Sequence, residues 1–326
     1  MSSADGAARD TAGAQRANRL WFALTAGLVL LVIVLLPITA ISLADEARTQ
    51  SRSDVYDFFT GHAFDFSASV PTDAAFVNIA VTDIDESRGV ATLTISGNRA
   101  CGAQCVPITA GLFAIGQDAA RRLGLPPSAT FALPDDPGPY TETVSLPVSG
   151  WPQRYPFDTY ALTLGLTAET TSPDGTRVPL DAQQAGERNV FVTLEDSVSR
   201  LSMSAPMPVD PAAVSSPGAS GAFFAVDRVS WQRPLYLRLL TILLVSLIAA
   251  SAVFALSLKD LEDLLLGIGG IILGVWGVRS IVVQTELPDL TLVDIALALI
   301  ILLLLLALAI RAARHFYRRS GFHRRA

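Results

Sequence analysis

Long apolar stretches and one large polar segment divide this chain. The stretches that are apolar over about 18 residues or more are Leu20–Leu43, Leu235–Leu258, Leu264–Val283 and Leu292–Ile310. About 20 residues, at a helical rise of ~1.5 Å each, cross the ~30 Å hydrocarbon core of a bilayer. The pattern therefore predicts a transmembrane anchor at residues 20–43 and further transmembrane helices at 235–258, 264–283 and 290–311.

The polar segment, residues 45–233, has the alternation that is typical of strands. In Tyr160–Leu166, large residues fall at every second position, which places them on one buried face of a sheet. Gly and Pro interrupt the segment at short intervals, as in β-sandwiches and barrels. The predicted strands are Phe76–Val81, Val90–Ile95 ending at a Gly97-Asn98 turn, Thr141–Val148, Tyr160–Leu166, Asn189–Leu194 and Ala222–Val229. We expect a short helix at Gly116–Gly124 and a long loop at Ser202–Ser220.

The predicted fold is thus an extracytoplasmic all-β, sandwich-like domain inserted between one N-terminal and three C-terminal transmembrane helices. Its orientation follows from arginines near the chain ends: Arg9, Arg16 and Arg19, then Arg311, Arg314, Arg318, Arg319, Arg324 and Arg325. The positive-inside rule places both termini in the cytoplasm of a multi-pass protein of the plasma membrane. Residues 1–19 are expected to form a disordered tail and residues 312–326 a basic tail, both cytoplasmic.

The first apolar stretch has a second interpretation, as a signal peptide cleaved near Ser42-Leu43-Ala44. Its apolar core is longer than the roughly 7–15 residues of a signal peptide, which favours an uncleaved anchor. The domain is exported under either interpretation.

The charge of the exported segment limits the classes of partner that it can bind. The chain carries −6, but residues 45–233 contain 22 acidic and 12 basic residues and carry −10. A phosphate backbone would repel such a domain, so nucleic acid is excluded as a partner. The partners that we expect are membrane lipid and either another copy of the chain or an envelope protein.

Cys101 and Cys105 are the only cysteines, and both lie in the exported segment. An oxidising compartment favours a local disulfide between them, with two unpaired thiols as the alternative. Zinc needs more ligands than this pair and the isolated His62 provide. The acidic groups Asp83/Asp85/Glu86 and Glu195/Asp196 could bind calcium, although solvated turns are the favoured interpretation. We expect no cofactor, no metal and no catalytic residue.

A proline- and aromatic-rich stretch, Trp151-Pro152-Gln153-Arg154-Tyr155-Pro156-Phe157-Asp158, precedes the strongest predicted strand. Two prolines and three aromatics predict a rigid, packed structural corner, which includes Trp151, Tyr155, Pro156, Phe157 and Asp158. Asp158 is expected to accept hydrogen bonds from neighbouring backbone amides or from Arg154. A ligand site at this corner is the alternative.

The three C-terminal stretches contain polar and small residues at regular positions. Trp231, Arg233 and Tyr236 precede or open the first of them and predict an aromatic and basic girdle at the membrane surface. The next stretch carries Gly267, Gly270, Gly274 and Gly277 on one helix face, which predicts close packing against a neighbouring helix.

Two charges face each other across the last predicted hairpin. Arg279 and Asp294 lie about one turn from the outer ends of their helices, level with Arg238. Because a charge within a span is costly, we expect Arg279 and Asp294 to form an intramembrane ion pair. Snorkelling of Arg279 to the surface is the alternative.

These features together resemble a known family. The motifs that carry the likeness are Tyr155-Pro156-Phe157-Asp158-Thr159-Tyr160, Trp276-Gly277-Val278-Arg279-Ser280, Pro288 and Thr291-Leu292-Val293-Asp294. With one anchor, an exported β domain and three spans, the chain resembles the uncharacterised membrane proteins grouped as domain-of-unknown-function family 4436. The likeness covers most of residues 20–311 and implies the four-span layout but no activity. The Pro156-Phe157-Asp158 corner is also similar to one in pentameric ligand-gated channels, which differ in having four spans after the domain and a longer disulfide loop.

Three classes of function follow from these predictions. The leading one is a non-catalytic membrane protein whose exported β domain binds a partner or an envelope component. The second is a channel- or transporter-like oligomer that uses the C-terminal helices. An exported hydrolase is the least supported, since the exported segment has one histidine, no nucleophile-elbow motif and no zinc-ligand spacing.

Overall fold

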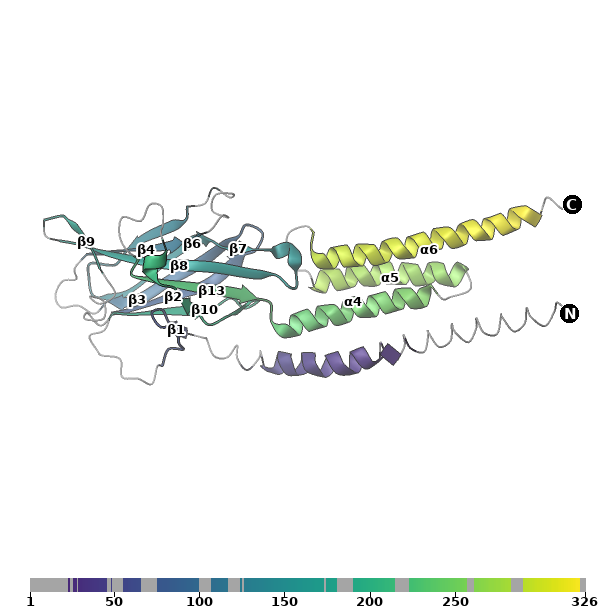
Figure 1. Ribbon diagram of the computed structural model, residues 1–326, viewed down its shortest axis with the longest axis horizontal. Coiled ribbons are helices and arrows are strands. Elements are labelled where there is room, and N and C mark those ends of the chain that lie inside the picture. Colours follow the sequence, from purple (N-terminus) through teal and green to yellow (C-terminus); the bar gives the residue numbers. More distant parts are fainter. Residues whose placement is uncertain are drawn as a thin grey trace. The chain divides into compact units, whose positions relative to one another are not determined.

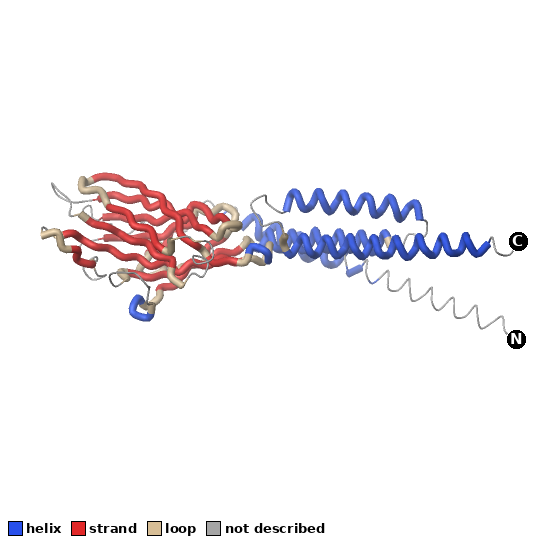
Figure 2. The backbone as a smooth tube through the Cα atoms, turned by 90° about the horizontal axis from the view of Figure 1, so that it is seen from above, coloured by secondary structure: helices blue, strands red, loops and turns tan. Residues whose placement is uncertain are grey.

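The computed structural model describes residues 23, 26–27, 29–45, 48, 55–65, 75–99, 107–116, 124, 126–172, 174–180, 190–214, 223–256, 261–282 and 290–322. The chain divides into two units: a β domain built from Glu46–Pro234, and a helical unit that contains Leu235–Thr285 and Leu290–Ala326. Figure 1 labels the elements of both units, and Figure 2 separates strands from helices by colour.

The first sheet of the β domain has five strands in the order β1-β10-β2-β3-β6. Their bounds are β1 Val55–Asp57, β10 Val190–Asp196, β2 Ala75–Asp85, β3 Val90–Arg99 and β6 Gly138–Pro147. Strands β10 and β2 run parallel, and the other pairs are antiparallel. This sheet therefore joins strands that lie more than a hundred residues apart in the chain.

The second sheet follows the order β11-β13-β8-β4-β5, with β12 added on β13 and with β7 and β9 added on β8. Its strands are β4 Ile108–Ala114, β5 Ser128–Ala132, β7 Ser149–Gly150, β8 Thr159–Thr171, β9 Arg177–Pro179, β11 Ser202–Met203, β12 Met207–Pro208 and β13 Ala225–Gln232. All its pairings are antiparallel. Two short 3-10 helices, η1 (Pro152–Arg154) and η2 (Pro211–Ala213), complete the domain.

One apolar core joins the two sheets. It includes Ile79 and Leu93 from the first sheet and Leu162, Val229 and Trp231 from the second, all fully buried. Because side chains alternate across a strand, every second residue of β3 and β8 points into this core. The β-rich, two-sheet character predicted from the alternation is therefore present.

Two local predictions about strands are wrong. Strand β3 does not end at Gly97-Asn98 but continues to Arg99, with Gly97 opposite Val77 and Tyr140. A Cβ at Gly97 would overlap the carbonyl oxygen of Phe76 and lie 2.6 Å from the hydroxyl oxygen of Tyr140, so this glycine serves close packing and not a turn. The predicted loop at Ser202–Ser220 contains β11, β12 and η2 in its described part. In the predicted helix at Gly116–Gly124, residues 117–123 lie outside the described residues.

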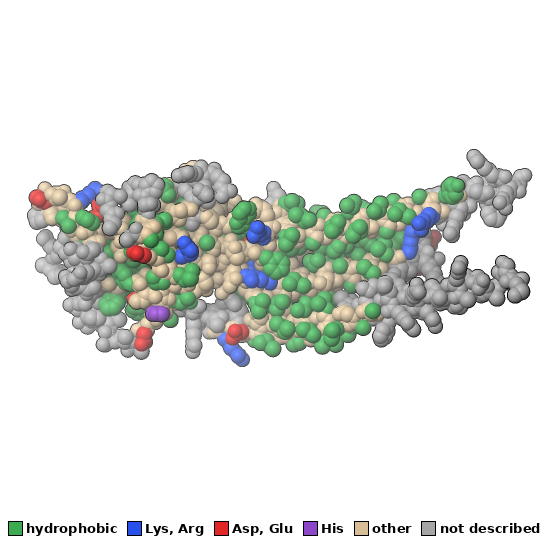
Figure 3. Space-filling view, viewed as in Figure 1, with side chains coloured by type: hydrophobic (Ala, Val, Ile, Leu, Met, Phe, Trp, Pro, Cys, Tyr) green, Lys and Arg blue, Asp and Glu red, His purple; other side chains and the backbone are tan. Residues whose placement is uncertain are grey.

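The helical unit contains α4 (Leu235–Ala255), α5 (Leu261–Val282) and α6 (Leu292–Phe322). These three helices are long and apolar enough to cross a membrane, and hydrophobic side chains cover much of their visible surface (Figure 3). They pack together through Ala252, Ala255, Leu264, Ile268 and Leu304. The described N-terminal helix, Val29–Asp45, is apolar but shorter than a span.

Candidate functional site

The β domain contains a group of five charged side chains, which we call the Arg233 cluster: Asp83, Glu86, Asp158, Arg200 and Arg233. Glu86, Asp158 and Arg233 are buried, and Asp83 is exposed. The Arg233 side chain is completely buried, a rare situation for arginine. Its Nε donates to Asp158, at 3.3 Å from Oδ1 and 3.0 Å from Oδ2, and its Nη2 donates to Oε2 of Glu86. Its guanidinium carbon lies 4.9 Å from the ring centroid of Tyr155, within the range of a cation–π contact.

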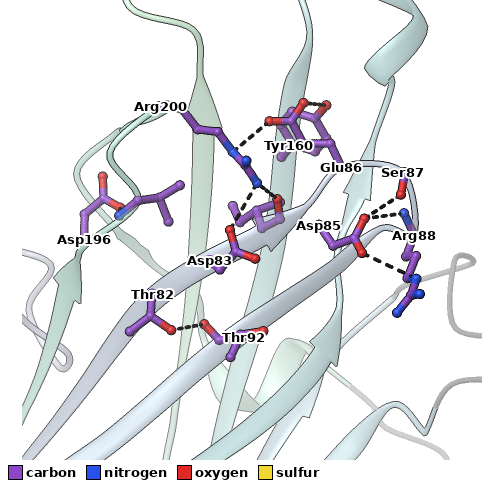
Figure 4. Close-up of polar contacts among 12 residues, drawn as sticks. Thr82, Asp83, Asp85, Glu86, Ser87, Arg88, Thr92, Tyr160, Asp196 and Arg200 are labelled. Carbon is purple, nitrogen blue, oxygen red and sulfur yellow. Dashed lines mark hydrogen bonds and ion pairs between the residues drawn. The ribbon is translucent and has the colours of Figure 1, made fainter. Parts of the chain in front are cut away.

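A second arginine completes the cluster from the opposite side of Glu86. Nε of Arg200 lies 3.3 Å from Oε1 of Glu86. Its Nη2 donates to Oδ1 of Asp83 at 3.1 Å and to the carbonyl oxygen of Ile84 at 2.6 Å. Figure 4 shows Arg200 extending between Glu86 and Asp83, with the Tyr160 hydroxyl 3.4 Å from Oε2 of Glu86. Glu86 therefore bridges two arginines that come from separate parts of the chain.

The loops that hold the two buried carboxylates are locally determined. Glu86 follows β2 in a tight turn, where Oδ1 of Asp85 accepts hydrogen bonds from the Ser87 hydroxyl at 2.7 Å and the Arg88 amide at 2.9 Å (Figure 4). Gly89 closes this turn with a φ of 64°, a conformation that favours glycine. Asp158 comes from the corner between η1 and β8, in which the Tyr155–Pro156 peptide bond is cis.

Burial and pairing act in opposite directions on the ionisable groups of the cluster. Burial raises the pKa of Glu86, and the charges of Arg233 and Arg200 offset only part of that effect. Burial acts to lower the pKa of Arg233, but Glu86 and Asp158 outweigh it and leave the pKa raised. Burial, with the nearby charge of Glu86, raises the pKa of Tyr160, so its hydroxyl remains a donor. Buried charges cost several kcal/mol each unless paired, so these groups depend on one another.

Residues 65–211 match the family model described as a domain of unknown function (DUF4436). The chain carries a DUF4436 domain. The match contains four of the five residues of the Arg233 cluster and ends before Arg233 itself. Among curated proteins, no match to the sequence was found.

The predicted corner of the DUF4436 domain is only partly buried. Tyr155, Pro156 and Asp158 are buried as predicted, but 59% of Trp151 and 45% of Phe157 are exposed. The prediction that all five residues pack inward is therefore wrong for the two outermost aromatics. The exposure of Phe157 follows from geometry, because Asp158 turns inward to Arg233 and its neighbour then faces outward.

The expected partner of Asp158 is also different. Asp158 binds the guanidinium of Arg233, and Arg154 lies over the ring of Trp151 with its Cζ 5.2 Å from the ring centroid. The predicted surface girdle at Trp231, Arg233 and Tyr236 is wrong for its first two members, which are fully buried in the β domain. No local pattern in the sequence indicated that Glu86 binds both Arg233 and Arg200.

In the helical unit, Arg279 and Asp294 lie together as expected, with Nε of Arg279 2.6 Å from Oδ1 of Asp294. Oδ2 of Asp294 accepts from the amide of Thr291 at 3.0 Å and from its hydroxyl at 2.8 Å. The Thr291 hydroxyl in turn accepts from the amide of Asp294 at 3.3 Å, a reciprocal cap at the start of α6. Arg238, expected at the same depth, lies in the first turn of α4.

The predicted glycine face of α5 has no close neighbour among the described residues at three of its four positions. No described residue comes within 4 Å of a Cβ placed on Gly270, Gly274 or Gly277. The buried side of α5 is instead formed by Leu264, Ile268 and Val275. The described parts of α4 and α6 therefore do not pack against Gly270, Gly274 or Gly277, since α5 meets these helices through its large apolar residues.

The acidic groups considered for calcium have structural partners. Oε2 of Glu195 accepts from Nδ2 of Asn78 at 2.6 Å, and Asp196 accepts from the amides of Val198 and Met203 at 3.2 Å and 3.0 Å. Among the described residues, no three His, Cys, Asp or Glu side chains lie together in a way that could hold a metal ion. Cys101 and Cys105, the predicted disulfide, lie outside the described residues.

Proposed function

We propose that this chain is a non-catalytic integral membrane protein whose DUF4436 domain lies outside the cytoplasm and binds a partner protein, an envelope component or another copy of the chain. Three apolar helices of spanning length support the membrane location. The basic residues at both chain ends and the −10 charge of residues 45–233 support the proposed sidedness.

The observation that carries the binding role is the position of Arg233. Only Pro234 separates this residue from α4, which begins at Leu235. Within the domain, Arg233 is held by Glu86 from the turn after β2 and by Asp158 from the corner before β8. A domain that receives a load or a signal needs a firm connection to its anchor, and buried ion pairs provide one because they are costly to break.

The use of the charges also favours binding over catalysis. The carboxylates of Glu86 and Asp158 are occupied by arginines and fully buried, so neither is presented to a substrate. A general acid or base must come within hydrogen-bond reach of the substrate proton that it transfers. This arrangement supports a structural role for the cluster, in which it connects the turn after β2 and the corner before β8 to the residue next to Pro234.

A channel- or transporter-like oligomer is the second candidate, favoured by the glycine face of α5. Gly270, Gly274 and Gly277 are open to a helix from outside the described chain. Small residues on a membrane helix permit close approach of another helix, so this face fits a second copy.

Two measurements on the full-length protein test these proposals. For sidedness, Asp174→Cys at the β8–β9 turn is expected to react with a membrane-impermeant maleimide on intact cells. Tyr317→Cys at the exposed end of α6 is the matched control, expected to react only after permeabilisation. The unsubstituted protein measures the background from Cys101 and Cys105. Labelling of Tyr317→Cys alone on intact cells would refute the orientation.

The second measurement is the mass of the protein in detergent, combined with conductance of reconstituted bilayers. A monomer or dimer without conductance supports the binding role. A ring-sized oligomer that conducts ions would replace it with the channel candidate.

A further inference from the structure

The corner of the DUF4436 domain exposes two large aromatic side chains and an arginine. Trp151 and Phe157 are exposed, although the residues beside them, Tyr155, Pro156 and Asp158, are buried. Arg154 lies over the face of Trp151 and leaves its charge at the surface. An amphipathic aromatic, an apolar aromatic and an arginine are the residue types that occupy the interface between membrane and water.

The chain connectivity limits how far this corner can be from the bilayer. Asp158 is bound to Arg233 by two hydrogen bonds, and Leu235 is the first residue of α4. Two residues of extended chain span at most about 7 Å. The ion pair therefore ties the corner to the residue that enters the first C-terminal candidate span. This restraint is independent of any other contact between the domain and the helices.

The charge of the corner differs from that of the rest of the domain. The exposed residues between 151 and 158 are Trp151, Gln153, Arg154 and Phe157, and none is acidic. The only carboxylate in this range, Asp158, is buried against Arg233. In a domain of net charge −10, the segment 151–158 therefore exposes one arginine and no carboxylate.

We propose that this corner docks on the phospholipid surface that α4 enters, with Trp151 and Phe157 in the interfacial region and Arg154 at the lipid phosphates. Aromatic rings gain at the interface because the ring leaves water while the indole N–H keeps a polar partner. An arginine pairs with phosphate through its planar set of donors. The proposed ligand of the corner is thus an anionic or zwitterionic phospholipid. The proposal rests on α4 spanning the membrane, but it does not depend on which side of the membrane the domain occupies.

The test uses the full-length protein reconstituted into vesicles of phosphatidylcholine and phosphatidylglycerol. Part of the phosphatidylcholine carries bromine near the head-group end of its acyl chains, where it quenches tryptophan at the interface. The difference in emission between the unsubstituted protein and Trp151→Phe isolates Trp151 from the other three tryptophans. The expected result is loss of this difference emission with brominated lipid, and little effect of iodide present on both sides of the bilayer.

A matched control places a reporter at the opposite end of the same strand. Val178 on β9 is exposed and pairs with Thr170 near the end of β8, about 40 Å along the strand from Thr159. In the Trp151→Phe background, the Val178→Trp emission is expected to be quenched by iodide and not by brominated lipid. Trp151 emission that behaves in the same way, or that resists both quenchers because protein covers it, would overturn the proposal.

Arg154→Gln tests the charged part of the contact. In vesicles that contain phosphatidylglycerol, this variant is expected to show weaker lipid quenching of Trp151 than the unsubstituted protein. Equal quenching in the two proteins would overturn the role assigned to Arg154. The maleimide experiment on sidedness reports a different property, so failure of one proposal is distinguishable from failure of the other.

Discussion

Asp227 is a buried carboxyl group in the core of the β domain, and it makes the stability of the domain dependent on pH. On β13 it lies on the same face as Ala225 and Val229, which point into the core, and it is opposite Leu164 of β8. Neither of its oxygens has a hydrogen-bond partner among the described residues. Burial, followed by the charge of Asp57, raises the pKa of Asp227 to about 7. The carboxyl is therefore neutral in the folded domain at mildly acidic pH.

The sign and size of the effect follow from linkage. An unfolded aspartate ionises near its ordinary pKa of 3.8, whereas the folded one stays protonated to about pH 7. Between these values the unfolded state loses its proton first, so stability falls as the pH rises through this window and levels off above it. A pKa difference of about three, at about 1.4 kcal/mol for each pH unit, makes the total loss about 4 kcal/mol. About 3 kcal/mol of this loss falls between pH 5 and pH 8.

Asp227→Asn removes the ionisation with almost no change in side-chain volume. We expect the free energy of unfolding of this variant to exceed that of the unsubstituted protein by about 3 kcal/mol more at pH 8 than at pH 5. The assay is urea unfolding of the full-length protein in detergent at several pH values, followed through the buried Trp231. The pH dependence of the difference is the decisive quantity, because a buried amide without partners has its own constant cost.

The control is Asp136→Asn, at an exposed position between β5 and β6. It should leave the pH dependence of unfolding unchanged. If the difference between Asp227→Asn and the unsubstituted protein were the same at pH 5 and pH 8, the carboxyl would be hydrogen-bonded in solution and the reasoning would be refuted.

Three further predictions concern the Arg233 cluster, the ion pair between Arg279 and Asp294, and the close packing at Gly97 of β3. Arg233→Met removes the arginine partner of the buried Asp158 and one of the two arginines that bind Glu86. It should lower the free energy of unfolding by about 3–5 kcal/mol, whereas Arg228→Met, at an exposed position of the same strand, should change it little. Equal effects of the two substitutions in urea unfolding would contradict the stabilising role of the cluster. A double-mutant cycle of Arg279→Leu and Asp294→Leu, measured by thermal unfolding in detergent, should give a coupling energy of about 1 kcal/mol. The coupling is small because 40% of the arginine side chain is exposed and solvent partly screens the pair. Additive losses of stability would exclude a stabilising ion pair. Gly97→Ala should destabilise the β domain by about 1–3 kcal/mol, because the added methyl group overlaps the backbone carbonyl of Phe76. An unchanged free energy of unfolding would show that β2 and β3 move apart there at low cost.

The parts of the fold that could be predicted are those that depend on local periodicity. Residues Tyr160–Leu166, which form part of β8, could be predicted as a strand because large residues recur there at every second position. Strand β4 was missed because its sequence, ITAGLFA, includes small residues and a glycine that weaken the pattern. In β4, Gly111 is close to Thr167 of β8, a long-range contact that no local pattern reveals.

The same distinction applies to the charged pairs. Arg279 and Asp294 are 15 residues apart in the chain, on the consecutive helices α5 and α6, so counting residues from the predicted turn places them at the same level. Arg233 is 75 residues from Asp158 and 147 residues from Glu86. The contacts of Arg233 with Asp158 and Glu86 exist only because β13 and β8 are neighbours in the second sheet, while the turn after β2 approaches them from the first sheet. A charge next to an apolar stretch was therefore assigned to the membrane surface, which is the usual location but not the one found here.

The ion pair between Asp158 and Arg233 explains why the corner has both buried and exposed residues. From Phe157 to Tyr160, as the chain enters β8 at Thr159, exposed and buried side chains alternate. Once Asp158 turns inward to pair with Arg233, its neighbours Phe157 and Thr159 must turn outward. The exposure of Phe157 is thus the geometric consequence of satisfying a buried charge, and it occurs beside the residue that precedes α4. A substitution that released Asp158, such as Arg233→Met, should therefore alter the lipid quenching of Trp151 as well as the stability of the domain, and it would connect the two properties in one protein.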